Sequence, residues 1–410
     1  MSMQIKPILA ALRRHKAGAL LIALQIALTL AIVCNALFII QQRLAHLSEP
    51  TGIDEANLLV ISNQWAGHMS PQQVDAQIIT DLATLRQLPS VQDAAPGSGY
   101  PLKGGGWDNY VMRTPDQIKP TTDASVYLGD EHMLDTLGVK LIAGRNFNAG
   151  DVTRMEGRQV VIPPTVIVTK ALADHLFPDG SALGKPIYSM SPMPSTIVGI
   201  VERMQRQGVS NWNKPYAYES LLWPMRQDGG GLYYIVRAKP GQLAAAMKEV
   251  PQALFAQNRM RIIDPKDGGA YPQIRERAYD SDRGMAILMG IISAVLLAIT
   301  AAGIVGLTSF WVGQRRKQIG VRRALGATKR DILSYFLTEN LLIGIGGVIV
   351  GTVLAIGINL WMVTQFEMAR LSLAYVGAGV VALLLLGQAA VLAPALRASH
   401  ISPVEATRSV

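Results

Sequence analysis

The chain has 410 residues, of which 50% are hydrophobic and only 16% are charged, and its 38 Lys and Arg against 29 Asp and Glu give a net charge of +9. Soluble domains carry about 25% charged residues, so this composition argues against a purely soluble protein and for membrane spans beside a globular part. The single cysteine, Cys34, excludes an intramolecular disulfide. The bases cluster beside apolar runs, which favours a membrane surface over nucleic acid as the partner.

Four apolar runs are each long enough for a transmembrane helix, which needs about 20 residues to cross a hydrocarbon core of roughly 30 Å. We predict these helices over residues 17–42, 284–312, 332–363 and 372–396. The first run follows four bases, as a signal peptide would. It is far longer than the roughly 7–15 apolar residues of a signal peptide, however, and no clear cleavage site follows it. We therefore interpret it as a retained membrane anchor.

The distribution of Lys and Arg predicts the orientation of these helices. Residues 1–16, 313–331 and 397–410 are rich in bases, whereas the short connection 364–371 has one acid and one base. Because basic segments stay on the cytoplasmic side, we expect both termini and residues 313–331 to face the cytoplasm. The long segment 43–283 then lies outside.

Small and polar residues interrupt the apolar runs. Gly347-x-x-x-Gly351 in the third helix has a spacing that lets helices approach closely in lipid, and it fits packing within the chain as well as a contact between subunits. Asn35 and Asn359 also lie inside predicted spans. We interpret both as partners in hydrogen bonds between helices, although polar residues in a membrane can also be functional.

The long segment between the first two spans predicts a folded α+β domain, because turn signals alternate with strand-like and helical runs. A strand at 57–62 and a helix at 74–88 open the segment, and a strand at 232–238, a helix at 241–258 and a strand at 259–264 close it. We expect Pro251 to kink or split the second helix. The middle is richer in Pro and Gly, and it predicts short strands at 164–169 and 195–201 with a brief helix at 171–177. We therefore expect a domain interrupted by an inserted one.

No motif in the chain predicts catalysis or metal binding. The nearest approach to a phosphate loop, GSALGKP at 180–186, has one residue too few between its glycines and Pro186 where the hydroxyl belongs, so we interpret it as a turn. The six histidines form no metal-binding spacing, and the chain has no nucleophile elbow. Lys103-Gly-Gly-Gly is a candidate binding loop. We predict no catalytic residue and no metal site, and the sequence does not reveal substrate-binding residues.

The connection between the second and third spans, GQRRKQIGVRRALGATKRDI at 313–332, carries seven bases and one acid. On a helix, Val321 and Leu325 fall on one side and most of the bases fall on the other. Glycines cost about 1 kcal/mol each against Ala in a helix, so Gly320 and Gly326 predict a short or bent one. A helix that only fixes topology on anionic lipid would explain the charges, but it does not explain why apolar Ile319 sits among them.

Three stretches of sequence resemble the MacB/FtsX-type permeases of ABC transporters, the type VII or mechanotransmission superfamily. The first is IGVRRALGATKRDI at 319–332. The second is PALRASHISPVEATR at 394–408, in which Pro394, Arg397, Pro403, Val404, Glu405, Ala406 and Arg408 occupy matching positions. The third is LGVKLIAGRNF at 137–147, followed by VIVTKALADHLFP and LGKPI. The resemblance covers nearly the whole chain.

The resemblance implies a polytopic membrane protein of four helices with a large extracytoplasmic domain between helices 1 and 2. That domain would have a porter-like part at 54–95 and 230–282 and a sabre-like insertion at 96–229. The segment 313–331 would contact an ABC ATPase in the cytoplasm. The residues that the family pattern places in this contact are Arg315, Arg316, Gln318, Ile319, Gly320, Arg322, Arg323, Leu325 and Gly326.

The resemblance also implies partners and a location. The chain would reside in the bacterial inner membrane and pair with a second permease chain, either its own copy or a paralogue. It would hold no cofactor itself, because ATP and magnesium would bind the ATPase. A periplasmic adaptor and an outer-membrane channel can complete such an assembly, and membrane lipid surrounds it.

Two departures from the family pattern limit this reading. MacB carries its ATPase on the same chain, whereas no ATPase motif occurs in these 410 residues, so we expect the ATPase on a separate polypeptide. An acid commonly precedes the Ile-Gly pair, and here Gln318 stands in its place.

We expect efflux of a drug, a peptide or a similar substrate. The alternatives are lipoprotein extraction from the membrane and an FtsX-like regulator of a cell-wall hydrolase that moves no cargo.

Overall fold

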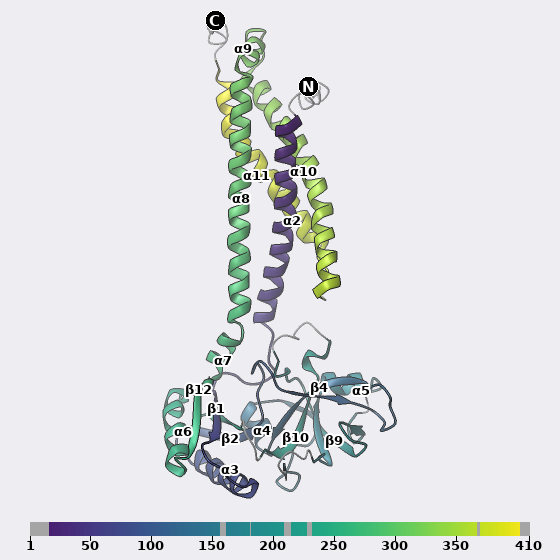
Figure 1. Cartoon of the computed structure of the whole chain (residues 1–410), viewed down its shortest axis with the longest axis vertical. Helices are drawn as coiled ribbons and strands as arrows, with labels where there is room; N and C mark the ends of the chain where they lie inside the picture. Colours follow the sequence, from purple (N-terminus) through teal and green to yellow (C-terminus); the bar gives the residue numbers. More distant parts are fainter. Residues whose placement is uncertain are drawn as a thin grey trace. The chain divides into compact units, whose positions relative to one another are not determined.

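The structure is a computed structural model that describes residues 16–155, 161–180, 182–208, 215–227, 232–366 and 370–401. The chain forms two compact units (Figure 1). One unit combines Met1–Leu47 with Ser281–Val410 and is helical, and the other is the α/β unit Ser48–Asp280.

Among the described residues, four helices are long and apolar enough to cross a membrane, which confirms the predicted number of spans. They are α2 (Lys16–Leu47), α8 (Asp280–Gln314), α10 (Lys329–Phe366) and α11 (Leu373–Ser399). A shorter helix, α9 (Arg316–Ala324), lies between α8 and α10 in the chain. The large α/β unit lies between α2 and α8 in the sequence, as the predicted fold class requires.

Small residues bring α10 close to α2. A Cβ atom at Gly351 would lie 2.8 Å from the carbonyl oxygen of Ala27, and one at Gly347 would lie 2.8 Å from that of Ala23. Only glycine leaves room for this backbone approach. The Gly347-x-x-x-Gly351 spacing therefore makes a packing contact within the chain.

Polar side chains inside the spans find partners on neighbouring helices. Asn35 on α2 donates to the carbonyl of Ala355 on α10 at 3.1 Å. The hydroxyls of Thr29 and Thr300 lie 2.7 Å apart and connect α2 with α8. Hydrogen bonds of this kind hold helices together where lipid offers none. Asn359 instead accepts from the amide of Leu371, just before α11.

The described part of the α/β unit contains twelve strands in one sheet, in the order β12-β1-β11-β2-β4-β10-β7-β9-β5, with β3 on β4, β6 on β10 and β8 on β9. The strands are β1 (Leu58–Trp65), β2 (Val91–Gly97), β3 (Trp107–Val111), β4 (Thr122–Gly129), β5 (Leu141–Gly144), β6 (Thr153–Arg154), β7 (Thr165–Thr169), β8 (Pro186–Tyr188), β9 (Pro194–Val201), β10 (Ser220–Arg226), β11 (Leu232–Ala238) and β12 (Arg261–Ala270). The helices are α3 (Pro71–Arg86), α4 (Met133–Leu137), α5 (Lys170–Leu176), α6 (Leu243–Gln257) and α7 (Tyr271–Ala278).

Two separate hydrophobic cores divide this sheet into halves. In the first half, β1, β2 and β11 pack with α3 and α6 around residues such as Ile78, Tyr234 and Leu254. In the second half, β4, β7, β9 and β10 pack with α5 around Trp223 and its neighbours. Between the halves, β2 and β4 pair only at Gly97 and Gly129. The chain builds part of the first half, passes through the second, and returns to complete the first with β11, α6 and β12 (Figure 1).

Candidate functional site

The predicted coupling segment folds into a helix, a tight turn and the start of a second helix. Helix α9 ends where Gly326 adopts a left-handed conformation with φ +97°. The amide of Gly326 donates to the carbonyl of Arg323 at 3.2 Å, and that of Ala327 donates to the carbonyl of Arg322 at 3.0 Å. This pair of bonds is a Schellman closure, which glycine favours because it has no Cβ. The predicted short helix is therefore present, and a glycine ends it.

A reciprocal cap starts the next helix immediately after this turn. The Thr328 hydroxyl accepts from the amide of Asp331 at 3.3 Å, and the Asp331 carboxylate accepts from the amide of Thr328 at 2.9 Å. Such a capping box satisfies two amides that the helix itself cannot bond. The turn between α9 and α10 is thus fixed at both of its ends.

The inner face of α9 is apolar. Ile319 is only 5% exposed and belongs to a buried cluster with Trp311, Ile332 and Phe336. Gly320 is also buried. These contacts explain why an isoleucine interrupts the basic sequence: its side chain packs α9 against α8 and α10.

Arg315, directly before α9, forms a buried ion pair with Glu339 on α10. Its Nη1 lies 2.9 Å from both carboxylate oxygens. The Arg315 side chain is 10% exposed and that of Glu339 is 3% exposed. The sequence places Arg315 on an outward basic face, but the structure turns it inward, because a buried carboxylate 24 residues later offers it a partner. Removing one member of such a pair costs about 3–5 kcal/mol, so this contact fixes the start of α9 to α10.

Arg322 on α9 also contacts α10. The Arg322 guanidinium lies 4.9 Å from the ring centre of Tyr335 on α10, at cation–π distance. Arg323 is half-buried. The Arg322 side chain therefore helps to hold α9 in place, as well as carrying charge.

The outer face of α9 exposes an apolar pair within a basic rim. Leu325 is 83% exposed and Val321, one turn earlier, is 50% exposed. Arg316, Lys317 and Gln318 are exposed on the same helix. Exposed apolar residues surrounded by polar ones are typical of surfaces that bind another protein or a membrane. We call Val321 and Leu325 the outer apolar pair of α9.

The predicted site residues thus separate into two groups. Arg315, Ile319 and Gly320 face inward, whereas Arg316, Gln318 and Leu325 face outward. Sequence reasoning missed Glu339 and Tyr335, which hold the segment in place. An acid inside an apolar run, as at Glu339, is the signal that could have revealed the first of them. The C-terminal matches Pro403, Val404, Glu405, Ala406 and Arg408 lie outside the described residues.

The first turn of α8 is also tied to α2. Asp282 accepts from Nη1 of Arg43 at 2.6 Å, and its other oxygen lies 2.7 Å from Nδ1 of His46. Asp282 is mostly buried. Helix α8 therefore joins α2 through a polar contact at its first turn and precedes α9 at its last.

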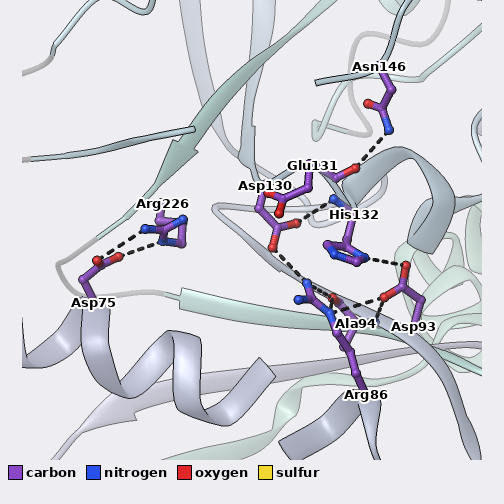
Figure 2. A network of polar contacts seen from close by, with 9 residues as sticks. All are labelled: Asp75, Arg86, Asp93, Ala94, Asp130, Glu131, His132, Asn146 and Arg226. Carbon is purple, nitrogen blue, oxygen red and sulfur yellow. Dashed lines mark hydrogen bonds and ion pairs between the residues drawn. The ribbon is translucent and has the colours of Figure 1, made fainter. Parts of the chain in front are cut away.

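A polar network connects the two halves of the α/β unit (Figure 2). Arg86, at the end of α3, donates to the carbonyl of Ala94 on β2 and to the Asp130 carboxylate at 3.0 Å, just after β4. Its Nε also lies 3.4 Å from Asp93, whose other oxygen is 3.0 Å from Nδ1 of His132. Burial raises the pKa of Asp130, and the neighbouring Arg86 opposes that rise.

A second ion pair joins the same two halves. Arg226, at the end of β10, forms a pair with Asp75 on α3 at 2.8 Å, and both side chains are largely buried (Figure 2). The hydrogen bond to Asp75 raises the pKa of Arg226. The halves are therefore joined by charged side chains where the backbone pairing between β2 and β4 is minimal. Groups of three or more metal-binding side chains are absent from the described residues.

Two family models match the chain. The model described as MacB-like periplasmic core domain matches residues 19–253, and the model described as FtsX-like permease C-terminal matches residues 290–403. The first range covers most of α2 and the α/β unit as far as α6, and the second covers most of α8 together with α9, α10 and α11.

Over the aligned regions, curated relatives are about a quarter identical to the chain. The macrolide export ATP-binding/permease protein MacB of Chromobacterium violaceum is 27% identical, over 77% of this chain and 49% of its own. MacB 1/2 of Paracoccus denitrificans is 26% identical, over 97% of this chain and 57% of its own. The uncharacterized ABC transporter permease YvrN of Bacillus subtilis is 26% identical over 69% of each chain. The chain thus spans about half the length of the MacB relatives it matches.

One solved structure with a similar region is the periplasmic region of MacB from Actinobacillus actinomycetemcomitans. It is 18% identical with a TM-score of 0.33, covering 57% of this chain and 97% of its own. The extracellular domain of the transporter YknZ from Gram-positive bacteria is 13% identical, also with a TM-score of 0.33, over 50% of this chain and 99% of its own.

Proposed function

The chain belongs to the MacB/FtsX-type permeases of ABC transporters, and from this premise we propose that it converts ATP hydrolysis by a cytoplasmic ABC ATPase into movement of its extracytoplasmic domain. The ATPase would bind the outer apolar pair of α9 and its basic rim. The chain itself would be a membrane subunit without catalytic residues.

The observation that carries this proposal is the two-sided character of α9. Its outer face exposes Leu325 at 83%, which costs solvation free energy unless a partner covers it. Its inner side is held by the Arg315–Glu339 ion pair and by buried Ile319. A helix that binds a partner on one face and is anchored to α10 on the other can transmit a displacement.

The orientation that this mechanism needs agrees with the charge distribution. Basic residues around α9 favour the cytoplasmic side, and the α/β unit would then lie outside. Residence in the bacterial inner membrane is part of this proposal. A movement of α8 would reach the α/β unit through α7, which ends at Ala278, two residues before α8 begins. The polar network around Arg86 would keep the two halves of that unit together during the movement.

We propose efflux as the process that this movement drives. The names of the MacB relatives state macrolide export, which supports a drug, a peptide or a similar substrate. The partners in this proposal are a second permease chain, an adaptor and an outer-membrane channel. The size of the α/β unit favours cargo movement over an FtsX-like regulatory role.

The proposal is tested by reconstituting the full chain with its cognate ABC ATPase in lipid nanodiscs. Hydrogen exchange is measured by mass spectrometry without nucleotide and with ATP and vanadate, which arrests the ATPase after hydrolysis. We expect protection of residues 316–328 when the ATPase binds, because the outer face of α9 is then covered. We also expect changed exchange in the α/β unit that appears only with nucleotide.

Two controls make the result decisive. An ATPase variant that binds ATP without hydrolysing it separates the effect of binding from that of turnover, and nanodiscs without ATPase give the baseline. Protection of α9 without any nucleotide-dependent change in the α/β unit would contradict the transmission of movement. Failure to form a complex would contradict the proposal as a whole.

A further inference from the structure

A basic pocket of about 430 Å³ lies within the α/β unit, between the loop after β2 and the segment formed by β12 and α7. Its walls include three cations, Lys103, Lys266 and Arg277, and one carboxylate, Asp267. The pocket therefore has a net charge of +2. Its volume falls within the range of sites that enclose small ligands.

Carboxylates offset only part of the positive charge around the pocket: Asp267 lies in the wall, and Asp264 accepts from the amide of Lys266 at 2.8 Å. The Asp267 carboxylate already accepts hydrogen bonds from the hydroxyls of Ser62 at 3.1 Å and Tyr233 at 2.7 Å. Among the described residues, Lys103 and Lys266 form no ion pair, and Lys103 lies 5.1 Å from the ring centre of Tyr233. Charged ammonium groups that share a pocket attract an anion.

Arg277 adds a fixed donor to the same pocket. Its Nη1 donates to the carbonyl of Lys266 at 2.6 Å, its Nη2 to that of Gly268, and its Nε to that of Gln273 at 3.4 Å. Three of its five N–H groups are thus used on uncharged carbonyls, which orient the guanidinium without cancelling its charge. The remaining two can bind an anion.

Tyr100 lines the same pocket. Tyr100 is only 3% exposed, and its hydroxyl forms no hydrogen bond within the described part of the chain. Burial and the nearby Asp267 carboxylate raise the pKa of Tyr100 to about 12, so the group remains a hydrogen-bond donor at neutral pH. This hydroxyl can donate a hydrogen bond to an acceptor oxygen of a ligand in the pocket.

The loop that carries Lys103 is held in a strained conformation. Leu102 has φ +68°, a left-handed conformation that is sterically unfavourable for a residue with a Cβ, and it is buried. The amide of Gly104 donates to the carbonyl of Gln207 at 2.9 Å, and the Tyr271 hydroxyl donates to that of Pro101 at 2.6 Å. Strain that the surrounding structure maintains is typical of ligand-binding loops.

We propose that this pocket binds the phosphate group of an anionic phospholipid. Phosphate oxygens match the donors of Arg277, Lys103, Lys266 and Tyr100, since arginine and lysine are the preferred partners of phosphate. The apolar wall residues Leu102, Ile274 and Ala278 suit the glycerol and the first methylenes of a lipid better than they suit a free ion.

The position of the pocket in the chain supports a lipid as the source of the phosphate. Met285 lies near the start of the apolar part of α8, and Arg277 is only eight residues before it in the chain. The pocket is therefore attached to a membrane-spanning helix by a short piece of chain. The proposal does not depend on the coupling to an ATPase.

The test uses the full chain in a neutral maltoside detergent, titrated with dihexanoylphosphatidylglycerol, dihexanoylphosphatidylcholine and inorganic phosphate in turn. Hydrogen exchange of peptides that cover residues 98–107 and 266–279 reports binding at the pocket rather than at the spans. We expect phosphatidylglycerol to protect both peptides at lower concentrations than either alternative. Phosphatidylcholine carries a choline cation that the pocket repels, and inorganic phosphate has no apolar part.

The double variant Lys103→Gln/Lys266→Gln should weaken phosphatidylglycerol binding about tenfold or more, because each lysine near an anionic lipid contributes on the order of 1 kcal/mol. The matched control is Lys248→Gln on α6, an exposed lysine outside the pocket, which should leave binding unchanged. Tyr100→Phe keeps the shape of the pocket and should weaken binding by a smaller factor.

Three results would overturn the proposal. Equal protection in the unaltered chain and in the double variant would remove the pocket as the site. Equal binding of phosphatidylcholine would contradict the recognition of an anionic lipid. Protection by inorganic phosphate at the same concentrations as phosphatidylglycerol would assign the pocket to free phosphate and reject the lipid.

Discussion

Replacing Glu339 by Leu tests whether the buried ion pair anchors the predicted coupling segment, residues 313–331. The Arg315 Nη1 lies 2.9 Å from both oxygens of Glu339, and both side chains are at most 10% exposed, so little solvent screening applies. Two unit charges centred about 4 Å apart attract by about 4 kcal/mol at an effective dielectric constant near 20. The variant leaves the Arg315 charge buried without its partner. We therefore expect the free energy of unfolding to fall by about 3 kcal/mol or more.

A double-mutant cycle separates the ion pair from ordinary packing. Unfolding in mixed micelles with increasing dodecyl sulfate is followed by circular dichroism for Glu339→Leu, Arg315→Met and the two combined. Because the double variant has no buried charge, we expect it to recover most of the loss and to cost less than about 1 kcal/mol. Additive losses, or a single loss below about 0.5 kcal/mol, would refute the anchoring role of the pair.

Two further predictions concern helix packing and pH. Gly351→Ala should destabilise the chain by about 1–3 kcal/mol, because its Cβ would lie 2.8 Å from the Ala27 carbonyl, whereas Gly357→Ala, with open space around it, should be neutral or slightly stabilising in the same unfolding assay. Burial raises the pKa of Asp130 in the folded state above its unfolded value near 3.8, so the folded chain binds more protons at this carboxyl than the unfolded chain does. The contribution of Asp130 to the stability of the folded chain therefore decreases as pH rises from 3.8 through the folded pKa. The stability of Asp130→Asn relative to the unaltered chain should therefore be more favourable at pH 7 than at pH 3.5, and an equal or opposite difference at the two pH values would contradict this reasoning.

Hydrophobic length and pattern predicted most of the fold. The four spans were predictable because their apolar runs are longer than the helices of a soluble core usually are. The predicted strand at 232–238 has the same bounds as β11, because every residue of this apolar run is buried. The sequence predicts that Pro251 kinks or splits a helix. The split is wrong, because α6 runs unbroken from Leu243 to Gln257 with Pro251 inside it. Its stripe of buried Ala246, Val250 and Leu254 packs on the sheet and outweighs the lost hydrogen bond.

Strand β12 shows where tertiary pairing overrides local signals. The sequence predicts a strand at 259–264, and the residues that follow, Pro265-Lys-Asp-Gly-Gly, have the composition of a turn. The strand instead continues to Ala270 and pairs with β1 across a register shift. Gly268 makes this possible, since a Cβ there would lie 2.6 Å from the Val60 carbonyl oxygen.

The outline of the predicted coupling segment, residues 313–331, could be predicted from the sequence, but its contacts could not. Helical spacing placed Val321 and Leu325 together on one side, and the two glycines predicted a short helix. Spacing cannot reveal that Arg315 turns inward, because its partner Glu339 lies on another helix. It also cannot show that Arg322 lies over Tyr335. Charge reversal at Arg322 would therefore disturb packing as well as binding, which makes Leu325 the cleaner position for a test.

The measurement that tests the central proposal most directly is the affinity of the cognate ABC ATPase for the full chain in nanodiscs. Burying a leucine contributes about 1.5–3 kcal/mol, so Leu325→Asp should weaken binding by about 10- to 100-fold. The matched control is Ile118→Asp, which makes the same kind of change at a fully exposed residue of the α/β unit and should leave the affinity unchanged. Equal affinities for the unaltered chain and Leu325→Asp would contradict docking of the ATPase on the outer face of α9.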